Sequence, residues 1–402
     1  MTATKKKIVF ISTHNLATNP RLVKEIKLAL DNSFKVEVIC FIFRNWSYAI
    51  NESLITEFKN KGVQFHTMEA GKADLKNWAI SVGKEKFNRF LSNAFSLKNN
   101  LLANAVSRRN VVLSKAINNV EAADWVIGHN PGALWATYVL GQKLQCKTGF
   151  DVEDYHPGEG NNKASQHLMK KLMQELLPKM NYVSFAAPLI MEEVKKDIQY
   201  ENENWFTLLN IFSNKEFNAP AIESESPLKF VWFSQHINEG RGLELLLPAI
   251  KLAGAAVELH LFGNMDTDFK EQYLKDATNI FMHAPISQYE LHQELAEYDI
   301  GLALEIPQDI NRNLCLTNKL LAYVQAGLFV IYTNTKAQAA FMQARLPNGE
   351  VLEINKTNPV AVVQNLVENK HLIRSYRSKA YSDSLLQNWE TASEKLLNAW
   401  NI

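Results

Sequence analysis

The feature that most constrains this chain is a repeated alternation of short apolar runs with amphipathic helical patterns. A first series has apolar runs of strand length at 7–12, 35–43, 63–67, 124–129, 147–151 and 181–187. A second series starts after residue 227 with the runs KFVWFS, VELHLF, NIFM, DIGLAL, LFVIYT and EVLEI. Strands that alternate with helices form parallel sheets covered by helices. The sequence therefore predicts an α/β protein with two Rossmann-like, doubly wound parallel-sheet domains that face each other across a cleft.

A polar segment, SNKEFNAPAIESESP, separates the two series and is rich in Ser, Asn, Pro and Glu. This composition is typical of a linker, although an ordinary surface loop fits it too. We predict an N-terminal domain over 1–212, a linker over 213–227 and a C-terminal domain over 228–377. An amphipathic helix is expected over about 378–402 at the C-terminus.

Composition excludes several classes of protein. The chain has 43 Lys and Arg against 42 Asp and Glu, so no overall positive field points to nucleic acid. No apolar run approaches the roughly 18 residues of a membrane-spanning helix, and the N-terminal apolar stretch is too short for a secretion signal. The three cysteines lie far apart in no metal-ligand spacing. We therefore expect a cytoplasmic protein from a reducing compartment.

The turn after the first apolar run excludes the commonest nucleotide-binding fingerprints. A dinucleotide oxidoreductase needs G-x-G-x-x-G there, so that the backbone can approach a pyrophosphate. The turn reads STHNLATNPR and has no glycine, and no G-K-[ST] of a P-loop occurs in the chain. Neither a nicotinamide or flavin cofactor nor a P-loop nucleotide site is expected.

Six motifs carry a resemblance to a known family. In chain order they are NPRLVKE, HNPGAL, FDVEDYHPGE, GRGLELL, GLALE and NKLLAYVQAG. Together they resemble the GT-B glycosyltransferases, most closely the retaining, family 4-like group 1 enzymes that build bacterial surface polysaccharides. The resemblance covers nearly the whole chain. It implies an acceptor-binding N-terminal domain, a C-terminal domain that binds a nucleotide-sugar, and a C-terminal helix that crosses back to the first domain.

The resemblance places part of the donor site at the glycine-rich turn of Gly240, Arg241 and Gly242. Departure of a nucleotide diphosphate leaves negative charge, and in such enzymes side-chain cations and helix N-termini stabilise it without a bound metal. The turn opens a helix predicted over 242–252, where backbone N–H groups can approach an anion. A solvated charge at a helix start is the alternative interpretation of Arg241.

A second part of the predicted donor site follows two later strands. Asn318 and Lys319 open another predicted helix, with Thr317 or Asn318 as its N-cap. Glu305 ends the run DIGLALE at the same expected sheet edge. Its carboxylate is expected either to accept hydroxyl groups of the donor or to pair with Arg312 or Lys319.

The sequence departs from the family pattern at two points. Counting back from Gly327, the two glutamates of that pattern fall on Leu314 and Ala322, and neither is acidic. The usual arginine before the glycine-rich turn is His236, preceded by Gln235 where the family has glycine. Either the donor is held differently, with Glu305 substituting, or the chain is a poor enzyme.

Polar residues at the ends of the N-terminal strands form the predicted acceptor side. His129, Asp151 and Glu153 are the predicted catalytic residues, because a histidine and carboxylates can take a proton or stabilise an oxocarbenium-like centre. Mutual pairing of these side chains is the alternative. Around the first turn, Asn15, Arg21 and Lys24 are predicted to bind the acceptor, for example through a phosphate, while a solvated helix face explains the two cations equally well.

The segment 72–115 is strongly basic, with nine Lys and Arg against Asp74 and Glu85. Four aromatic residues, Trp78, Phe87, Phe90 and Phe95, are interleaved with the charges. Such a segment can lie on an anionic membrane surface. An amphipathic helix whose aromatics enter the core is the alternative.

We therefore expect a metal-independent, retaining glycosyltransferase that moves a hexose from a nucleotide-diphosphate sugar to a lipid-linked or cell-surface glycan. No cofactor beyond that co-substrate and no nucleic-acid partner is expected. The expected location is the cytoplasm, peripheral on the inner face of the membrane. A catalytically silent GT-B protein that binds a glycan or a partner, and a nucleotide-sugar epimerase, are the alternatives.

Overall fold

The computed structural model describes residues 5–221, 227–345 and 347–400. The chain divides into two compact units: unit 1 is residues 1–208 with 395–402, and unit 2 is residues 209–394. Residues 209–221, which include the start of the predicted linker, thus belong to unit 2. Positions 222–226 of that predicted linker lie outside the described residues.

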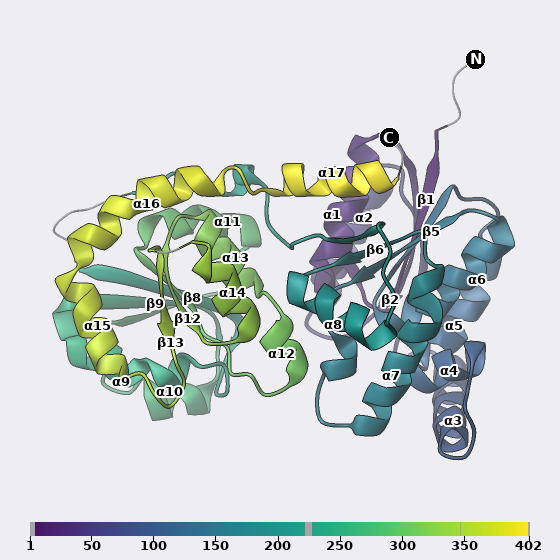
Figure 1. The fold of residues 1–402 in the computed structure, drawn as a ribbon, viewed down its shortest axis with the longest axis horizontal. Coiled ribbons are helices and arrows are strands. Elements are labelled where there is room, and N and C mark those ends of the chain that lie inside the picture. The colour runs from purple at the N-terminus through teal and green to yellow at the C-terminus, as the bar shows by residue number, and fades with distance from the viewer. Residues whose placement is uncertain (1–4, 222–226, 346, 401–402) are drawn as a thin grey trace. The chain divides into compact units, whose positions relative to one another are not determined.

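Unit 1 is built on a seven-stranded parallel sheet with the order β3-β2-β1-β4-β5-β6-β7. Its strands are β1 (Lys7–Ser12), β2 (Lys35–Ile42), β3 (Gln64–Glu69), β4 (Trp125–His129), β5 (Lys147–Val152), β6 (Tyr182–Phe185) and β7 (Trp205–Thr207). The helices that accompany the sheet (Figure 1) are α1 (Pro20–Asp31), α2 (Tyr48–Asn60), α3 (Leu75–Ser92), α4 (Asn99–Val106), α5 (Arg109–Ala116), α6 (Leu134–Leu144), α7 (Lys163–Leu176) and α8 (Pro188–Ile198). The predicted strands of the first series are confirmed as β1 to β6, and β7 is an addition.

Unit 2 is built on a six-stranded parallel sheet with the order β10-β9-β8-β11-β12-β13. Its strands are β8 (Leu228–Ile237), β9 (Val257–Met265), β10 (Ile280–His283), β11 (Ile300–Ala303), β12 (Phe329–Thr333) and β13 (Gly349–Leu352). Its helices are α9 (Leu247–Ala253), α10 (Thr267–Tyr273), α11 (Gln288–Glu294), α12 (Ile310–Leu314), α13 (Asn318–Gln325), α14 (Lys336–Gln343), α15 (Pro359–Glu368) and α16 (Lys370–Ser384). The predicted pair of doubly wound parallel sheets is confirmed.

Local sequence signals set the helix starts that matter for the site. Asn19 caps α1, because its side chain accepts a hydrogen bond from the backbone N–H of Leu22, and Pro20 takes the first helical position. Thr317 caps α13 in the same way through the N–H of Leu320. Of the two residues predicted to cap α13, the structure has Thr317 rather than Asn318.

Two predicted helices are wrong in their extent. The helix expected over 242–252 is a short 3-10 turn, Leu243–Leu245, followed by α9. Pro248 lies in the first turn of α9 and has no N–H to bond back to residue 244, so a continuous helix would lose that hydrogen bond.

The single helix expected over about 378–402 is also wrong, since α16 ends at Ser384 and a separate helix, α17 (Trp389–Ala399), follows. Asn388 caps the new helix by accepting a hydrogen bond from the N–H of Thr391 at 2.8 Å. No helix among the described residues is both long enough and apolar enough to cross a bilayer.

The strand order fixes where ligands can bind in each unit. In both sheets the connections reverse direction beside the first strand, between β1 and β4 in unit 1 and between β8 and β11 in unit 2. Open parallel sheets bind ligands outside the carboxyl ends of their strands at such a switch point. Functional side chains are therefore expected just after β1, β4, β8 and β11.

Candidate functional site

A row of polar residues crosses the unit 1 sheet at its carboxyl edge. The parallel register pairs Ser12 of β1 with His129 of β4, His129 with Asp151 of β5, and Asp151 with Ser184 of β6. All four are buried. Since a buried polar group needs a partner, this row requires the side chains that α1 supplies.

Arg21 on α1 is the partner of Asp151. Its Nε and Nη2 donate to the two carboxylate oxygens at 2.5 and 2.6 Å, and its Nη1 donates to the Leu208 carbonyl at 2.8 Å. Ser184 adds a third donor to Asp151 at 2.6 Å. Burial alone would raise the pKa of Asp151, but the Arg21 guanidinium lowers it. Asp151 is therefore an ionised, fully bonded carboxylate rather than an available base.

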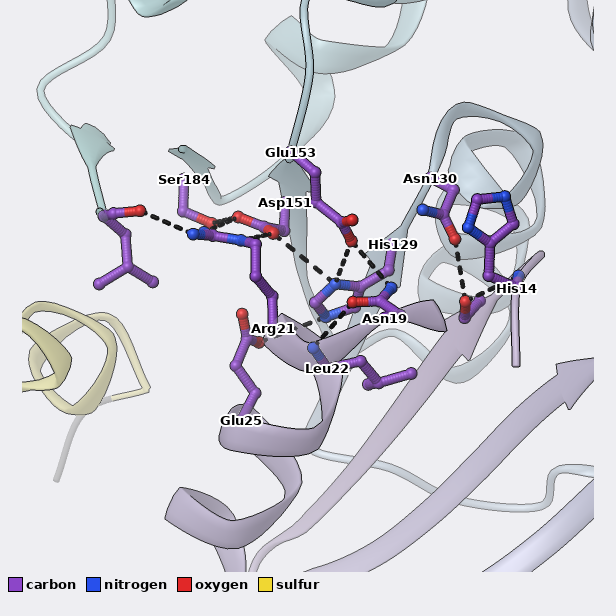
Figure 2. A network of polar contacts seen from close by, with 12 residues as sticks. His14, Asn19, Arg21, Leu22, Glu25, His129, Asn130, Asp151, Glu153 and Ser184 are labelled. Carbon is purple, nitrogen blue, oxygen red and sulfur yellow. Dashed lines mark hydrogen bonds and ion pairs between the residues drawn. The ribbon is translucent and has the colours of Figure 1, made fainter. Parts of the chain in front are cut away.

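His129 lies among three carboxylates, as Figure 2 shows. Its Nε2 is 3.4 Å from Glu25, and its Nδ1 is 3.3 Å from Glu153 and 3.7 Å from Asp151. Burial would lower the pKa of His129, but the charge of Glu25 and then the bond to Glu153 raise it to about 10. His129 thus carries a proton at neutral pH and can donate a hydrogen bond but not accept a proton.

Glu153 is the member of this cluster that solvent reaches. Its side chain is 15% exposed, whereas those of His129 and Asp151 are at most 1% exposed. Asn19 donates to the same carboxylate oxygen at 2.8 Å, so Glu153 is held from two sides. The three predicted catalytic residues are brought together here, and the pairing that was the alternative interpretation is present too.

Sequence reasoning missed Glu25, whose carboxylate completes the cluster. Burial raises the pKa of Glu25, and neither carboxylate oxygen has a partner with hydrogen-bond geometry. A signal existed, because Glu25 follows Arg21 by one helical turn on a face that also carries Leu22 and Ile26. Charged residues at i and i+4 on an apolar face indicate buried partners.

One trio in this cluster has the spacing of a metal site. The ligand atoms of Glu25, His129 and Asp151 all lie within 4.8 Å of one another. Both oxygens of Asp151 already accept from Arg21, whose positive charge opposes a second cation at that carboxylate. The donor set therefore fits a proton-holding network better than a metal centre, and the expected metal independence stays a prediction.

The three residues predicted to bind the acceptor differ in burial and in their partners. Asn15 is fully buried; its side chain donates to the Ser47 hydroxyl at 2.7 Å and accepts from Thr18. Arg21 is committed to Asp151 as described above. Lys24 is half-buried on α1. Two of the three thus hold unit 1 together, and acceptor contact for all three stays a prediction.

In unit 2 the structure brings the predicted donor residues to one edge of the sheet. Lys319 Nζ lies 3.2 Å from a Glu305 oxygen, and Arg312 approaches the other oxygen at 3.9 Å. The Lys319 ammonium also lies 5.5 Å from the centre of the Trp232 ring, a cation–π distance. The pairing alternative for Glu305 is therefore present, with both predicted partners.

The glycine-rich turn packs against Leu304, the residue before Glu305. Gly242 has φ +85°, and a Cβ there would lie 3.0 Å from the Leu304 Cβ. Only glycine allows both that conformation and that approach. The neighbouring Gly240 donates its N–H to Glu244 at 2.9 Å, and Arg241 is half-buried.

The remaining donor residue, Asn318, accepts from the Asn210 side chain at 2.8 Å. Because α9 starts only at Leu247, the turn at Gly242 opens a single 3-10 turn rather than a long helix. The helix dipole that could attract an anion to this turn is therefore weaker than predicted. An anion at this edge would depend more on the charges of Arg241, Arg312 and Lys319.

Two positions at which the sequence departs from the family pattern, Ala322 and His236, can be located in the structure. Ala322 is fully buried in an apolar cluster with Leu320 and Tyr323 on α13. His236 is exposed near the end of β8. The positions that carry a glutamate and an arginine in the family pattern thus supply an apolar helix face and a weaker cation.

The basic segment 72–115 exposes most of its aromatics. Phe87, Phe90 and Phe95 are 60%, 72% and 66% exposed, and Leu75 at the start of α3 is 65% exposed. Trp78 is half-buried beneath Lys72, whose Nζ lies 5.3 Å from the ring centre. The alternative that the aromatics enter the core is therefore wrong for the three phenylalanines.

The sequence matches no protein-family model and no curated protein. Solved structures are nevertheless similar over nearly the whole chain. A glycosyltransferase from Rickettsia africae is 12% identical, with a TM-score of 0.65 over 99% of this chain and 98% of that one. HepE from Anabaena in complex with UDP is 11% identical, with a TM-score of 0.66 over 98% of both chains. A TarM variant from S. aureus, in complex with Fondaparinux, alpha-GlcNAc-glycerol and UDP, is 14% identical, with a TM-score of 0.65 over 99% of this chain and 100% of that one.

These similarities extend along both parallel-sheet units rather than over one of them. At such low identity they establish architecture, and they agree with the resemblance carried by the six sequence motifs. The chain has the GT-B fold.

Proposed function

We propose that this chain is a glycosyltransferase that moves a hexose from a nucleotide-diphosphate sugar to a glycan. The observation that carries the proposal is the convergence of Gly242, Glu305 and Lys319 at the switch-point edge of unit 2 in a GT-B chain. HepE and TarM, which share the fold, were solved with UDP, and HepE also with UDP-glucose. A uridine diphosphate sugar is therefore the first donor to test.

The cations at this edge supply the chemistry that the donor half needs. When the bond from the sugar to the diphosphate breaks, negative charge grows on the departing oxygen, and Lys319 and Arg312 neutralise it. Arg241 and the backbone N–H groups at Gly242 add to that field without a metal ion. Before the donor binds, Glu305 balances the two cations, and it then becomes available to accept sugar or ribose hydroxyls.

The proposed transfer retains the anomeric configuration, and of the three predicted catalytic residues only Glu153 could serve as the base of an inverting transfer. An inverting transfer needs a side-chain base that takes the proton of the attacking hydroxyl. Asp151 is bonded to Arg21, and His129 already carries a proton. In a retaining transfer that proton passes to the departing phosphate, while Glu153, held by the His129 cation, orients the acceptor hydroxyl.

We propose a lipid-linked or cell-surface glycan as the acceptor, with the protein peripheral on the inner face of the membrane. The support is the exposed surface of Phe87, Phe90 and Phe95 among the lysines of segment 72–115. Aromatic side chains insert at the lipid interface, and each nearby lysine adds about 1 kcal/mol of attraction to anionic lipid.

The test of transfer is an incubation of the protein with UDP-glucose and other nucleotide-sugars, in EDTA and then in Mg²⁺. We expect metal-free release of nucleoside diphosphate on addition of a glycan acceptor, and a product whose anomeric proton has the same configuration as the donor. Absence of nucleotide binding in calorimetry, with and without Mg²⁺, would refute the proposal.

The membrane part is tested separately with vesicles of phosphatidylglycerol and phosphatidylcholine. Phe87→Ser with Phe90→Ser should abolish sedimentation with anionic vesicles. A matched variant, Trp46→Ser, removes an aromatic residue that is also 51% exposed in unit 1 but lies outside the segment, and it should leave sedimentation intact. Equal binding of both variants would contradict membrane contact through α3.

A catalytically silent GT-B protein is the second candidate, and buried Ala322 is the observation that favours it. Such a protein would bind a nucleotide or glycan but form no product with any donor. An epimerase would instead convert the donor sugar with no acceptor present, which chromatography of donor-only incubations detects.

A further inference from the structure

A second group of positive charges lies at the carboxyl edge of the unit 1 sheet, away from Arg21. Arg108 and Arg109 stand at the start of α5. Arg109 Nη1 donates to the Thr13 carbonyl just after β1, at 2.8 Å, and Arg108 Nη2 donates to the Ala70 carbonyl just after β3, at 3.3 Å. With His14, which follows Thr13, these two arginines form what we call the Arg109 cluster.

Arg109 is a half-buried cation without an acidic partner among the described residues. Its guanidinium lies 4.6 Å from the Phe43 ring centre and 5.7 Å from that of Phe41. Within the described part of the chain no carboxylate lies within ion-pairing distance of it. Glu85, an acid whose charge does act on Arg109, is itself paired with Arg89 at 3.0 Å.

The surroundings of Arg109 disfavour its charged form when no anion is bound. Burial, and then repulsion by Arg108, lowers the pKa of Arg109 to about 10. Burial, and then the charge of Arg109, also lowers the pKa of His14. Two arginines at the N-terminal end of a helix further oppose its dipole. An anion bound here would remove all of these penalties together.

The cluster lies next to the candidate catalytic residues. The His14 backbone N–H donates to Ser12, whose hydroxyl donates to Asn130 directly after His129 (Figure 2). Glu153, the exposed carboxylate of the His129 cluster, is close enough to act electrostatically on His14, as are His156 and Glu159. A ligand that reaches Glu153 therefore has an anion-binding group beside it.

We infer that the Arg109 cluster binds a phosphate-type oxyanion carried by the acceptor, so that the substrate of unit 1 is a phosphorylated or phosphate-linked glycan. That the bound anion belongs to an acceptor rests on the proposed function, whereas anion binding by the cluster does not. A planar guanidinium with free N–H groups matches two oxygens of one phosphate. A phosphate on the glycan and a phosphate in a lipid link share this chemistry.

The experiment measures thermal unfolding at rising concentrations of inorganic phosphate and of glycerol 3-phosphate, against potassium chloride at equal ionic strength. We expect both phosphates to raise the midpoint of the wild type. Arg109→Gln should weaken this response about tenfold or more, as loss of a charge-assisted hydrogen bond does. Each variant is compared with itself without phosphate, so a purely structural loss of stability does not move the readout.

The matched control is Arg345→Gln, which removes an arginine of unit 2 that is likewise stacked on a phenylalanine, Phe341 at 3.6 Å, and whose pKa is likewise lowered by burial. It should retain the full phosphate response. If Arg109→Gln does not fold, Arg108→Gln serves instead, because its single bond at 3.3 Å is easily replaced by water. A phosphate response that is absent in the wild type, or equal in both variants, overturns the inference.

A calorimetric titration with UDP separates this inference from the proposed function. If the anion belongs to the acceptor, Arg109→Gln binds UDP as the wild type does. A tenfold loss of UDP affinity with an unchanged glycerol 3-phosphate response would assign the anion to the donor and overturn the inference. If UDP binds to no variant while phosphate still binds at Arg109, the proposed function fails and the anion site stands. Vesicles with and without a phosphorylated lipid, scored for Arg109 dependence, then distinguish a lipid phosphate from a glycan phosphate.

Discussion

His129 Nε2 lies 3.4 Å from Glu25 Oε2, and neither side chain is more than 1% exposed. The pair joins the end of β4 to the middle of α1 inside unit 1. With Arg21 and Asp151 it makes a buried group of four ionisable side chains, next to the more exposed Glu153. A charged side chain buried this deeply is stable only when an opposite charge or a hydrogen-bond partner lies beside it. Substitution of one member is therefore expected to change the pKa of the others.

The first prediction concerns alkaline pH. The pKa of His129 rises from 6.5 to about 10 on folding. A raised pKa means that its stabilisation is fully present below pH 6.5 and is lost as the pH climbs through 10. Urea unfolding across that window should show falling stability in the wild type and a shallower fall in His129→Gln. His167→Gln, which replaces an exposed histidine, should follow the wild type. Parallel curves for all three proteins would mean that His129 is neutral in the fold.

Most of the fold could be predicted from the sequence, because each sheet is made of buried runs bounded by polar turns. The three-residue β7 is too short for any periodicity to indicate it. The helix expected over 242–252 was predicted through Pro248, where a missing N–H breaks the ladder.

The chemistry of the site was less predictable than its position. His129, Asp151 and Glu153 follow strand ends, and parallel register brings them together. The role of Glu25 depends on its burial, for which the sequence signal is its position one helical turn after Arg21 on the apolar face of α1. Arg109 was counted within a basic segment, and only the packing on Phe43 and the lack of an acid nearby distinguish it from a surface charge.

The second prediction is that Arg21→Met destabilises the protein by about 3–5 kcal/mol, since it leaves the Asp151 carboxylate buried and unpaired. Chemical unfolding measures the change. Arg44→Met is the control: Arg44 also pairs with a carboxylate, Glu69 at 2.6 Å, but is 59% exposed, and its loss should change stability by less than about 1 kcal/mol.

A double variant sharpens this second prediction. Asp151→Asn in the Arg21→Met background removes the orphaned charge and should recover part of the lost stability. Simple additivity of the two substitutions would show that the residues are not coupled.

The third prediction concerns Lys319 and the donor. Lys319→Met keeps most of the apolar stem of the side chain and removes its charge. It should weaken UDP binding by about 10- to 100-fold, the expected range for one charge-assisted contact to a phosphate. Lys356→Met provides the control, because Lys356 also pairs with a glutamate, Glu353 at 2.9 Å, but is 75% exposed. Calorimetry that gives equal affinities for both variants would remove Lys319 from the donor site.

Glu305→Gln addresses the two interpretations of that carboxylate. If Glu305 accepts hydroxyls of the donor, the variant should lose affinity for UDP-glucose but keep its affinity for pyrophosphate. If Glu305 serves only as a counter-charge to Lys319, both affinities should change in the same direction.

The fourth prediction concerns the end of the chain. Trp400 is fully buried in unit 1; its Nε1 donates to the Tyr182 hydroxyl at 3.1 Å, and its ring lies edge-on to Phe34, with centroids 5.8 Å apart. Trp400→Ala should therefore destabilise unit 1 by about 3–5 kcal/mol through cavity formation. Trp46→Ala, at a 51% exposed tryptophan of the same unit, should stay within about 0.5 kcal/mol of the wild type.

Trp400→Phe separates packing from hydrogen bonding at this position. It keeps most of the ring but removes the donor to Tyr182, so a loss of about 1 kcal/mol is expected. Chemical unfolding of the full chain, followed by far-UV circular dichroism, measures all three variants. Because the segment from residue 395 belongs to unit 1 but follows unit 2 in sequence, a large loss at Trp400 means that the core of unit 1 is incomplete without a residue that is made after the whole of unit 2. A wild-type unfolding curve for Trp400→Ala would instead mean that the Trp400 side chain contributes nothing to the stability of unit 1.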